Sequence, residues 1–269
     1  MNSAASARGP TPTWALVEQV AYWISIYVLP SAALVLLWDA AARVYGHPQL
    51  FPPPSNTLKT LIATLRDGSL WANSAASMAR ILMGFSIGSV LGVILGLLMG
   101  TLPNVRYALT PYIDFLRFVS ALAWITAFMV WFGIGETSKI LLLIYATAFG
   151  VAVNVADGVA AIPTTKIRTA QCFGISRAQM FFWVVMPASM PFIIAGMRLA
   201  LQNSFAAIIA AEMLAASRGL GFMIMSSRIF LQTDKTYVAI VALGFLGFLT
   251  DFSLMTAARK LAGRYQLSD

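Results

Sequence analysis

Six ionisable side chains lie inside long apolar segments of this sequence and are its first candidates for chemistry. A charged group near the centre of a membrane helix costs about 2.5–3.5 kcal/mol on insertion scales, so each needs a partner or a polar surrounding. The six residues are Asp114, Arg117, Asp157, Arg198, Glu212 and Asp251. Asp114 and Arg117 are three residues apart, which places both side chains on one helix face, and we expect them to form an ion pair. Arg117 and Arg198 can either offset the desolvation of a passing anion or anchor helix ends at the membrane surface.

Glu212 lies deep in an apolar segment that also carries a polar run at residues 202–204, which includes Asn203. Two interpretations are open for it. The carboxylate is either a buried group that is hydrogen-bonded to a neighbouring helix, or a gate in a pathway through the membrane.

A second mixed segment, residues 110–132, carries Ser120, Trp124 and Phe128. Aromatic side chains at helical spacing are often simply packed against other helices, because they bury large apolar areas. The alternative is that this segment lines a pathway, with Ser120 as its polar contact.

The sequence motifs and residue clusters of several kinds of enzyme and metal site are missing. No G-x-x-x-x-G-K-[ST] motif occurs, so this chain does not bind ATP in the P-loop manner, and any ATP-derived energy must come from a partner. No H-E-x-x-H motif is present either. The single cysteine, Cys172, and the single histidine, His47, exclude an internal disulfide, a cysteine cluster and a histidine-rich metal site. We therefore expect no metal and no cofactor bound by this chain.

Composition identifies the class of protein. Of the 269 residues, 59% are hydrophobic and 10% are charged, against about 25% charged in soluble proteins. The sequence is therefore that of an integral membrane protein in contact with lipid. The net charge of +8 comes from cations scattered between apolar segments, so loop orientation and lipid headgroups explain it better than nucleic acid does.

Segments of about 20 apolar residues are long enough to cross a membrane as helices. The sequence predicts an all-α protein whose six such spans cover residues 22–43, 74–102, 110–132, 137–161, 191–214 and 237–257. Six spans place both termini on one side. Residues 1–13 are rich in Ala, Ser, Pro and Thr and are expected to form a disordered tail, with one membrane domain over residues 14–269. Residues 55–68 form an amphipathic helix that we expect to lie at the membrane interface.

The second span carries five glycines, each four residues apart and so on nearly one helix face. They are Gly84, Gly88, Gly92, Gly96 and Gly100. Small residues at this spacing let helix backbones approach closely in lipid, so this face is predicted to pack against another helix. A glycine-lined pore is the alternative.

Residues 163–187 interrupt the apolar segments with a compact helical hairpin. Pro163 closes the preceding segment, and the Thr164–Thr165 pair can cap a new helix. Gly174 lies where a helix commonly ends in the left-handed conformation, and Ser176 with Gln179 has the spacing of a capping box. The hairpin is too polar to cross a bilayer, so it is either a docking element at the membrane surface or an ordinary loop.

Resemblance favours docking. The pattern I-R-x-A-Q-x-x-G-x-S-R-A-Q, which begins at Ile167, and the following Met186–Pro187 resemble the E-A-A…G…L-P signature of bacterial ABC importer permeases. The chain is most similar to the nitrate/sulfonate/taurine permease family, and within it to the taurine branch. Supporting matches occur at residues 51–54, 131–139, 211–212 and 218–222. The resemblance covers roughly residues 50–260 and implies the type I ABC importer permease fold, with six transmembrane helices and a cytoplasmic coupling hairpin.

The resemblance also assigns roles to residues. It places the contact with the ATPase on Arg168, Thr169, Ala170, Cys172, Gly174, Ser176 and Arg177. The Glu of the general motif is Arg168 here, which removes any ion pair of that Glu with the ATPase. The translocation pathway is expected at Ser120, Trp124, Phe128, Asn203 and Glu212. Related permeases carry prolines where this chain has residues 118–121, so we expect the third span to be straighter here.

The implied function is that of the permease subunit of an ATP-driven importer in the bacterial inner membrane, with cytoplasmic termini. The implied substrate is a small organic anion such as taurine or an alkanesulfonate, with nitrate, bicarbonate or an aromatic carboxylate as alternatives. Two cytoplasmic ATPase subunits would bind the ATP and Mg²⁺, a periplasmic protein would deliver the substrate, and a symmetric homodimer of permeases would present one hairpin to each ATPase. A secondary transporter is less favoured, because the sequence shows no pair of related halves with broken helices.

Overall fold

The computed structural model describes residue 26 and residues 28–262, and this part of the chain is almost entirely helical. The expected tail, residues 1–13, lies outside it. The helices are α2 (Leu29–Tyr45), α3 (Pro54–Arg66), α4 (Ser69–Thr101), α5 (Pro103–Phe118), α6 (Ala121–Phe132), α7 (Glu136–Ala160), α8 (Thr164–Cys172), α9 (Arg177–Met180), the π-helix η2 (Phe181–Val185), α10 (Met186–Ala215), α11 (Leu220–Ile229) and α12 (Thr233–Ala262).

Within the described residues, four helical segments are long and apolar enough to cross a membrane, and a fifth is counted if α5 and α6 form one bent span. The four are α4, α7, α12 and the continuous stretch Arg177–Ala215. The first predicted span, residues 22–43, lies partly outside the described residues, and α2 contains its C-terminal part. The chain is therefore a multi-pass membrane protein.

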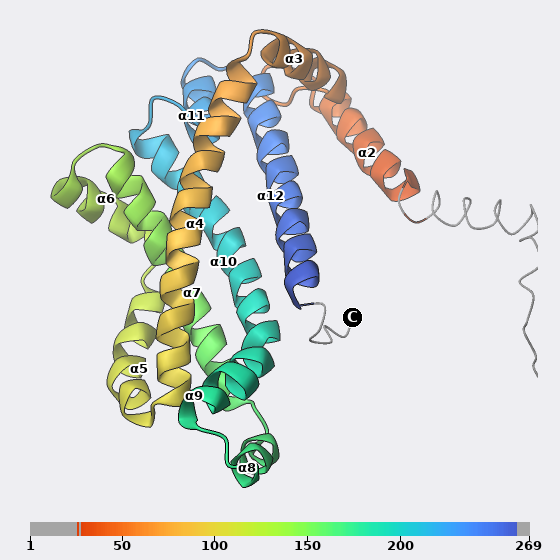
Figure 1. The fold of residues 1–269 in the computed structure, drawn as a ribbon. Helices are drawn as coiled ribbons and strands as arrows, with labels where there is room; N and C mark the ends of the chain where they lie inside the picture. The colour runs from red at the N-terminus through yellow and green to blue at the C-terminus, as the bar shows by residue number, and fades with distance from the viewer. Residues whose placement is uncertain (1–25, 27, 263–269) are drawn as a thin grey trace, which may run out of the picture.

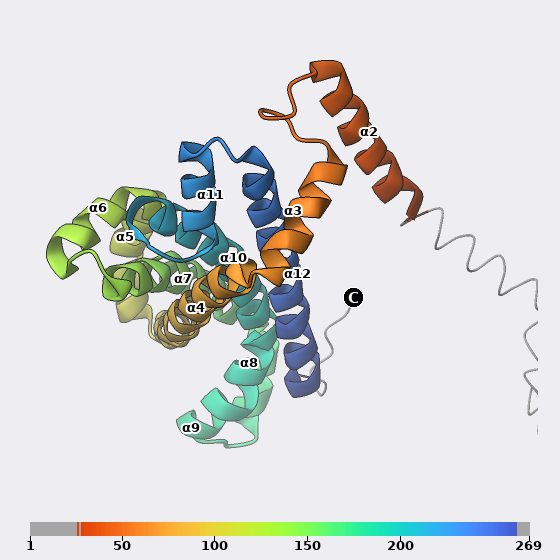
Figure 2. The ribbon, with the colours of Figure 1, turned by 90° about the horizontal axis from the view of Figure 1, so that it is seen from above.

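The core lies between α4, α7 and α10. Fully buried apolar side chains from all three helices meet there, among them Ile81, Leu142 and Ile208. Figures 1 and 2 both show α5 and α6 on one side of these three helices and α12 on the other. α2 diverges from the rest of the molecule, to which it is connected by α3 and by the stacking of Trp38 on Tyr237 of α12. This arrangement leaves α8 and α9 at one end of the molecule and α3 and α11 at the other (Figure 1).

The glycine face of α4 packs against α7, as the spacing predicts. A Cβ atom built on any of the five glycines would lie within 2.7 Å of the Cβ of a facing residue. The facing residues are Leu143, Thr147, Val151, Val155 and Val159, which are also four apart. The two helices therefore touch backbone to side chain along five successive turns, and this packing rules out a glycine-lined pore on this face.

The third span is not a straight helix from residue 110 to residue 132, and this prediction is wrong. It consists of α5 and α6, bent by 96° at Val119 and Ser120. Tyr145 of α7 donates hydrogen bonds from its hydroxyl to the carbonyls of Leu116 (2.6 Å) and Val119 (3.2 Å), and Ser120 caps α6 by accepting from the N–H of Leu122. The break needs no proline. Where the helix is interrupted, Tyr145 of α7 donates to the unpaired carbonyls and the Ser120 hydroxyl accepts from an unpaired N–H.

The start of the fifth span is also corrected. It was expected at Pro191, but α9, η2 and α10 form one continuous helical stretch from Arg177, with Pro191 inside α10. Pro187 directly follows the π-helical turn, and a local π adjustment of this kind lets a continuous membrane helix accommodate a proline. The second helix of the hairpin is therefore mechanically continuous with a membrane helix.

Candidate functional site

The hairpin of α8 and α9 projects from one end of the molecule (Figure 1). The turn between its helices has the expected local chemistry: Gly174 has a φ of +69°, a left-handed conformation that favours glycine. The N–H of Ser176 donates to Gln179 Oε1 (2.8 Å), and the N–H of Gln179 donates to Ser176 Oγ (3.3 Å). The capping box is confirmed. Neither Thr164 nor Thr165 caps α8, because Pro163 occupies the N-cap position without a side-chain hydrogen bond.

The residues predicted to contact an ATPase are available on this hairpin. All of them are exposed except Ala170, which is half-buried; the exposed ones are Arg168, Thr169, Cys172, Gly174, Ser176 and Arg177. Ile167 and Met180 point the other way and pack against the main core. A cavity of about 470 Å³ lies behind the hairpin, where α4 and α7 end.

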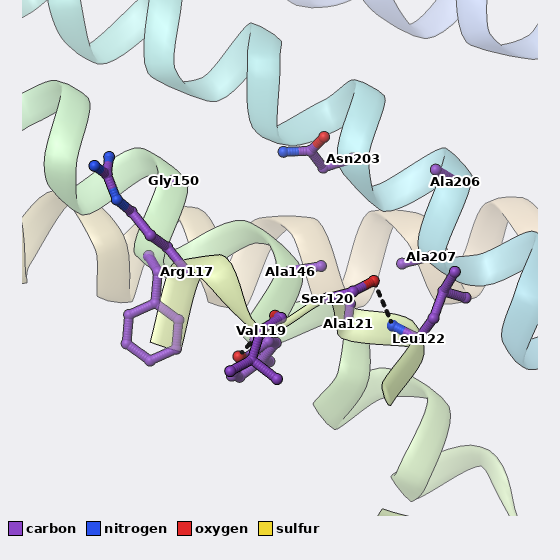
Figure 3. Close-up of a pocket in the computed structure, with 12 residues that line it drawn as sticks. Arg117, Val119, Ser120, Ala121, Leu122, Ala146, Gly150, Asn203, Ala206 and Ala207 are labelled. Carbon is purple, nitrogen blue, oxygen red and sulfur yellow. Dashed lines mark hydrogen bonds between the residues drawn. The ribbon is translucent and has the colours of Figure 1, made fainter. Parts of the chain in front are cut away.

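A second candidate site lies at the break between α5 and α6. A cavity of about 300 Å³ is lined there by residues of α5, α6, α7 and α10, including Arg117, Ser120 and Asn203 (Figure 3). The structure thus brings together two of the predicted pathway residues, Ser120 and Asn203, from segments 83 positions apart in the sequence (203 − 120). Asn203 is exposed on α10, and its amide makes no hydrogen bond to another described residue.

Trp124 and Phe128 do not line this cavity. Their rings lie 5.8 and 6.4 Å from that of Tyr145, and they pack against the main core from α6. Trp124 Nε1 is buried and has no hydrogen-bond partner among the described residues. These two side chains therefore hold α6 against α7 behind the cavity.

The charged side chains within the spans are paired. Arg117 Nε lies 3.1 Å from Asp114 Oδ1, as expected from their spacing. Arg198 of α10 forms a bidentate ion pair with Asp251 of α12, with two hydrogen bonds of 2.8 Å. The sequence alone did not suggest this pair. Arg106 lies 3.4 Å from Asp157.

Glu212 is a fully buried carboxylate that is hydrogen-bonded to two other helices, α4 and α11. Ser77 Oγ lies 2.9 and 2.8 Å from its two oxygens, Arg80 donates at 2.6 Å, and the N–H of Gly221 donates at 2.9 Å. Glu212 therefore joins α10 to α4 and caps the first turn of α11. It lies apart from the cavity that contains Ser120 and Asn203.

Arg80 extends this network to α7. Its guanidinium also contacts Glu136, which in turn pairs with Lys139 at 3.1 Å, and it donates to the carbonyl of Arg218 at 2.7 Å. Two cations and two carboxylates thus share one cluster with no net charge. Arg80, Lys139 and Glu212 are buried and Glu136 is 57% exposed, and the pairing offsets the cost of removing the three buried charges from water.

The cluster also fixes the loop that leads into α11. The N–H of Leu220 donates to Ser77 Oγ, and the N–H of Gly219 donates to Asn73 Oδ1. Gly219 lies so close to the Glu212 carboxylate that no side chain fits there. Sequence reasoning missed the role of Ser77 and Arg80. The available signal was that Arg80 is the single charged residue of a 33-residue helix, with Ser77 three residues before it on the same face.

No group of three or more His, Cys, Asp or Glu side chains that would hold a metal ion occurs among the described residues. The charged groups described above are instead satisfied by one another or by backbone groups. The arrangement is that of a membrane helix bundle with an exposed surface hairpin and a largely apolar cavity that contains a few polar side chains.

Comparison with known proteins identifies the family. Residues 88–264 match the family model described as "Binding-protein-dependent transport system inner membrane component". The chain is 37% identical over 253 residues to the taurine transport system permease protein TauC of Escherichia coli (strain K12), a match that covers 92% of this chain and 91% of that protein. It is 36% identical over 251 residues to the putative aliphatic sulfonates transport permease protein SsuC of the same organism, covering 93% of each.

The fold also has a solved counterpart. A chain of the MetNI methionine ABC transporter in an inward-facing conformation superimposes with a TM-score of 0.58 at 19% identity, covering 74% of this chain and 94% of that chain. The expected type I importer permease fold is confirmed. From the family match over 177 residues (264 − 88 + 1) and the 37% identity over almost the whole length, the chain belongs to the family of binding-protein-dependent transport system inner membrane components.

Proposed function

We propose that this chain is the membrane-spanning subunit of an ATP-driven importer for a small organic anion, with taurine or a short alkanesulfonate as substrate. The observation that carries the proposal is the exposed α8–α9 hairpin, which a membrane helix bundle without a docking partner does not need. The two Escherichia coli relatives are named as taurine and aliphatic sulfonate permeases, which supports the substrate class. The chain itself is a transport subunit and not an enzyme.

The partners follow from the same observation. We assign the hairpin to a cytoplasmic ATPase, which binds ATP and Mg²⁺, with contacts through Arg168, Thr169 and the exposed Cys172. Since each chain offers one hairpin, two copies arranged about a two-fold axis would engage two ATPases. A binding protein would then deliver the substrate at the opposite end, and both termini would be cytoplasmic.

The pathway would run along α10. Ser120 and Asn203 would line it, because both contact the cavity at the α5–α6 break. Trp124 and Phe128 would shape it from behind by holding α6, and Glu212 would keep the end opposite the hairpin in place through α11.

The test is ATP-driven uptake of radiolabelled taurine into liposomes that contain the permease, its ATPase and its binding protein. Excess ethanesulfonate should compete with uptake, whereas lysine and a neutral sugar should not. The permease alone should accumulate nothing. The proposal fails if the permease alone concentrates taurine, or if excess sulfonate leaves uptake and ATP hydrolysis unchanged while a carboxylate alters both.

A further inference from the structure

The cavity at the α5–α6 break is lined mostly by small and apolar residues, but it also contains hydrogen-bond donors that have no protein acceptor. The Asn203 amide makes no hydrogen bond to another described residue. The hydroxyl oxygen of Ser120 accepts from the N–H of Leu122 at 3.3 Å, which leaves its own hydrogen free to donate. Figure 3 shows Asn203 projecting from α10 over the break that carries Ser120. A polar face of this kind at mid-span is too costly to turn toward lipid, so it needs water or a ligand.

Arg117 adds positive charge to the same cavity. Its Nε pairs with Asp114, and its two terminal nitrogens make no hydrogen bond to another described residue. The side chain is 43% exposed, so the free nitrogens are open to a ligand. A guanidinium has a planar fork of donors that suits the oxygens of carboxylates, sulfonates and phosphates better than a point charge does.

Arg117 also borders a neighbouring cavity of about 250 Å³. That cavity continues along α5 and α7 to Arg106 and Asp157, which lie toward the hairpin end of the molecule. Two cations, Arg117 and Arg106, thus mark successive positions along one route, each next to a carboxylate. A nearby carboxylate weakens the attraction of each cation for an anion, and conduction requires that binding be weak enough for release.

We propose that the cavity at the α5–α6 break is a substrate site within the membrane, where a small sulfonate binds to Arg117, Asn203 and Ser120 before it moves toward Arg106. The inference rests on the proposed function and extends it, because selectivity would then reside in the permease as well as in the binding protein. The cavity volume of about 300 Å³ is at the lower end of ligand sites, which suits a two-carbon sulfonate.

The test is saturation binding of radiolabelled taurine to the permease–ATPase complex in nanodiscs, without the binding protein. The wild-type complex should bind one taurine per permease chain. Arg117→Gln should weaken binding at least tenfold and Asn203→Leu several-fold. Arg117→Lys should bind more tightly than Arg117→Gln, because it keeps the charge. The matched control is Arg198→Gln, which removes another arginine of the spans that does not line the cavity, and it should bind like the wild type.

The possible results of this experiment distinguish failure of the proposed substrate site from failure of the proposed import function. If the wild-type complex imports taurine with its binding protein but shows no saturable binding without it, the site is refuted and the proposed function stands. The site is also refuted if Arg117→Gln and Asn203→Leu both bind like the wild type. If Arg117→Gln fails to assemble with the ATPase, Asn203→Leu alone decides. Failure to import any sulfonate would instead overturn the proposed function.

Discussion

Glu212 should be the most sensitive single position for stability in the described part of the chain. The change to test is Glu212→Ala, which removes the acceptor of hydrogen bonds from Ser77, Arg80 and Gly221 at 2.6–2.9 Å. The Glu212 side chain has no exposed surface, so water cannot replace it without opening the structure.

The size of the effect can be worked out from these contacts. Breaking a buried ion pair on one side costs about 3–5 kcal/mol, because the remaining charge and donors are left without partners. Arg80 keeps its contacts with Glu136 and with the carbonyl of Arg218, which places the expected loss near the lower end. About 3 kcal/mol corresponds to a fall in Tm of about 6–12 °C for a chain of this length.

Thermal unfolding of the purified protein in detergent measures this shift. Asp157→Ala is the matched control: it also removes a carboxylate from an ion pair, but Asp157 and its partner Arg106 are 65% and 41% exposed, so water can reach the group left behind, and the Tm should fall by much less. The double variant Arg80→Ala/Glu212→Ala should lose less stability than the sum of the two single variants, since the pair is coupled. The reasoning is refuted if Glu212→Ala costs no more than Asp157→Ala, or if the effects of Arg80→Ala and Glu212→Ala add.

Three further predictions concern the hairpin and the helix packing. Gly174→Val should impair ATP-driven uptake more than membrane insertion, because its φ of +69° costs a residue with a side chain about 1 kcal/mol or more, and full uptake by this variant would count against a docking role. Gly92→Val should lower the Tm strongly, since a Cβ there would lie 2.6 Å from the carbonyl oxygen of Ala148, whereas Gly244→Val has open space and should not; equal Tm values would contradict the packing. Cys172 should react with a polar maleimide in the free permease and be shielded when the ATPase is bound, and equal labelling in both states would argue against contact there.

The features that the sequence predicted correctly depend on short stretches of chain. The turn of the hairpin is an example: Gly174 and the capping box at Ser176 and Gln179 are formed within six residues, so no distant segment is needed to recognise them. The ion pair of Asp114 and Arg117 is equally local. The family resemblance rested on the same short motif, and the comparisons confirm it.

Two predictions about helix boundaries failed, and one of them depends on a partner far away in the sequence. The missing prolines suggested a straight third span, but the break at Val119 is stabilised by the hydroxyl of Tyr145, 26 residues later. The fifth span was placed too late, because Pro191 was taken as its start although the helical stretch continues without interruption from Arg177. The break was therefore selected by a contact with another helix, whereas the second error came from treating a proline as a helix start although a π-helical turn lets the helix continue through this region.

The sequence by itself determined that this is a helical membrane protein with a capped surface hairpin and a glycine face on its second span, since composition and periodicity suffice for these properties. Only the tertiary structure decided what each of these surfaces meets. It placed the glycine face against α7, joined Glu212 to Arg80 across 132 positions, and brought Asn203 to the cavity beside Ser120. The physical reason is that hydrogen bonds and close packing depend on distances in space, and residue types and spacing do not specify which helices become neighbours.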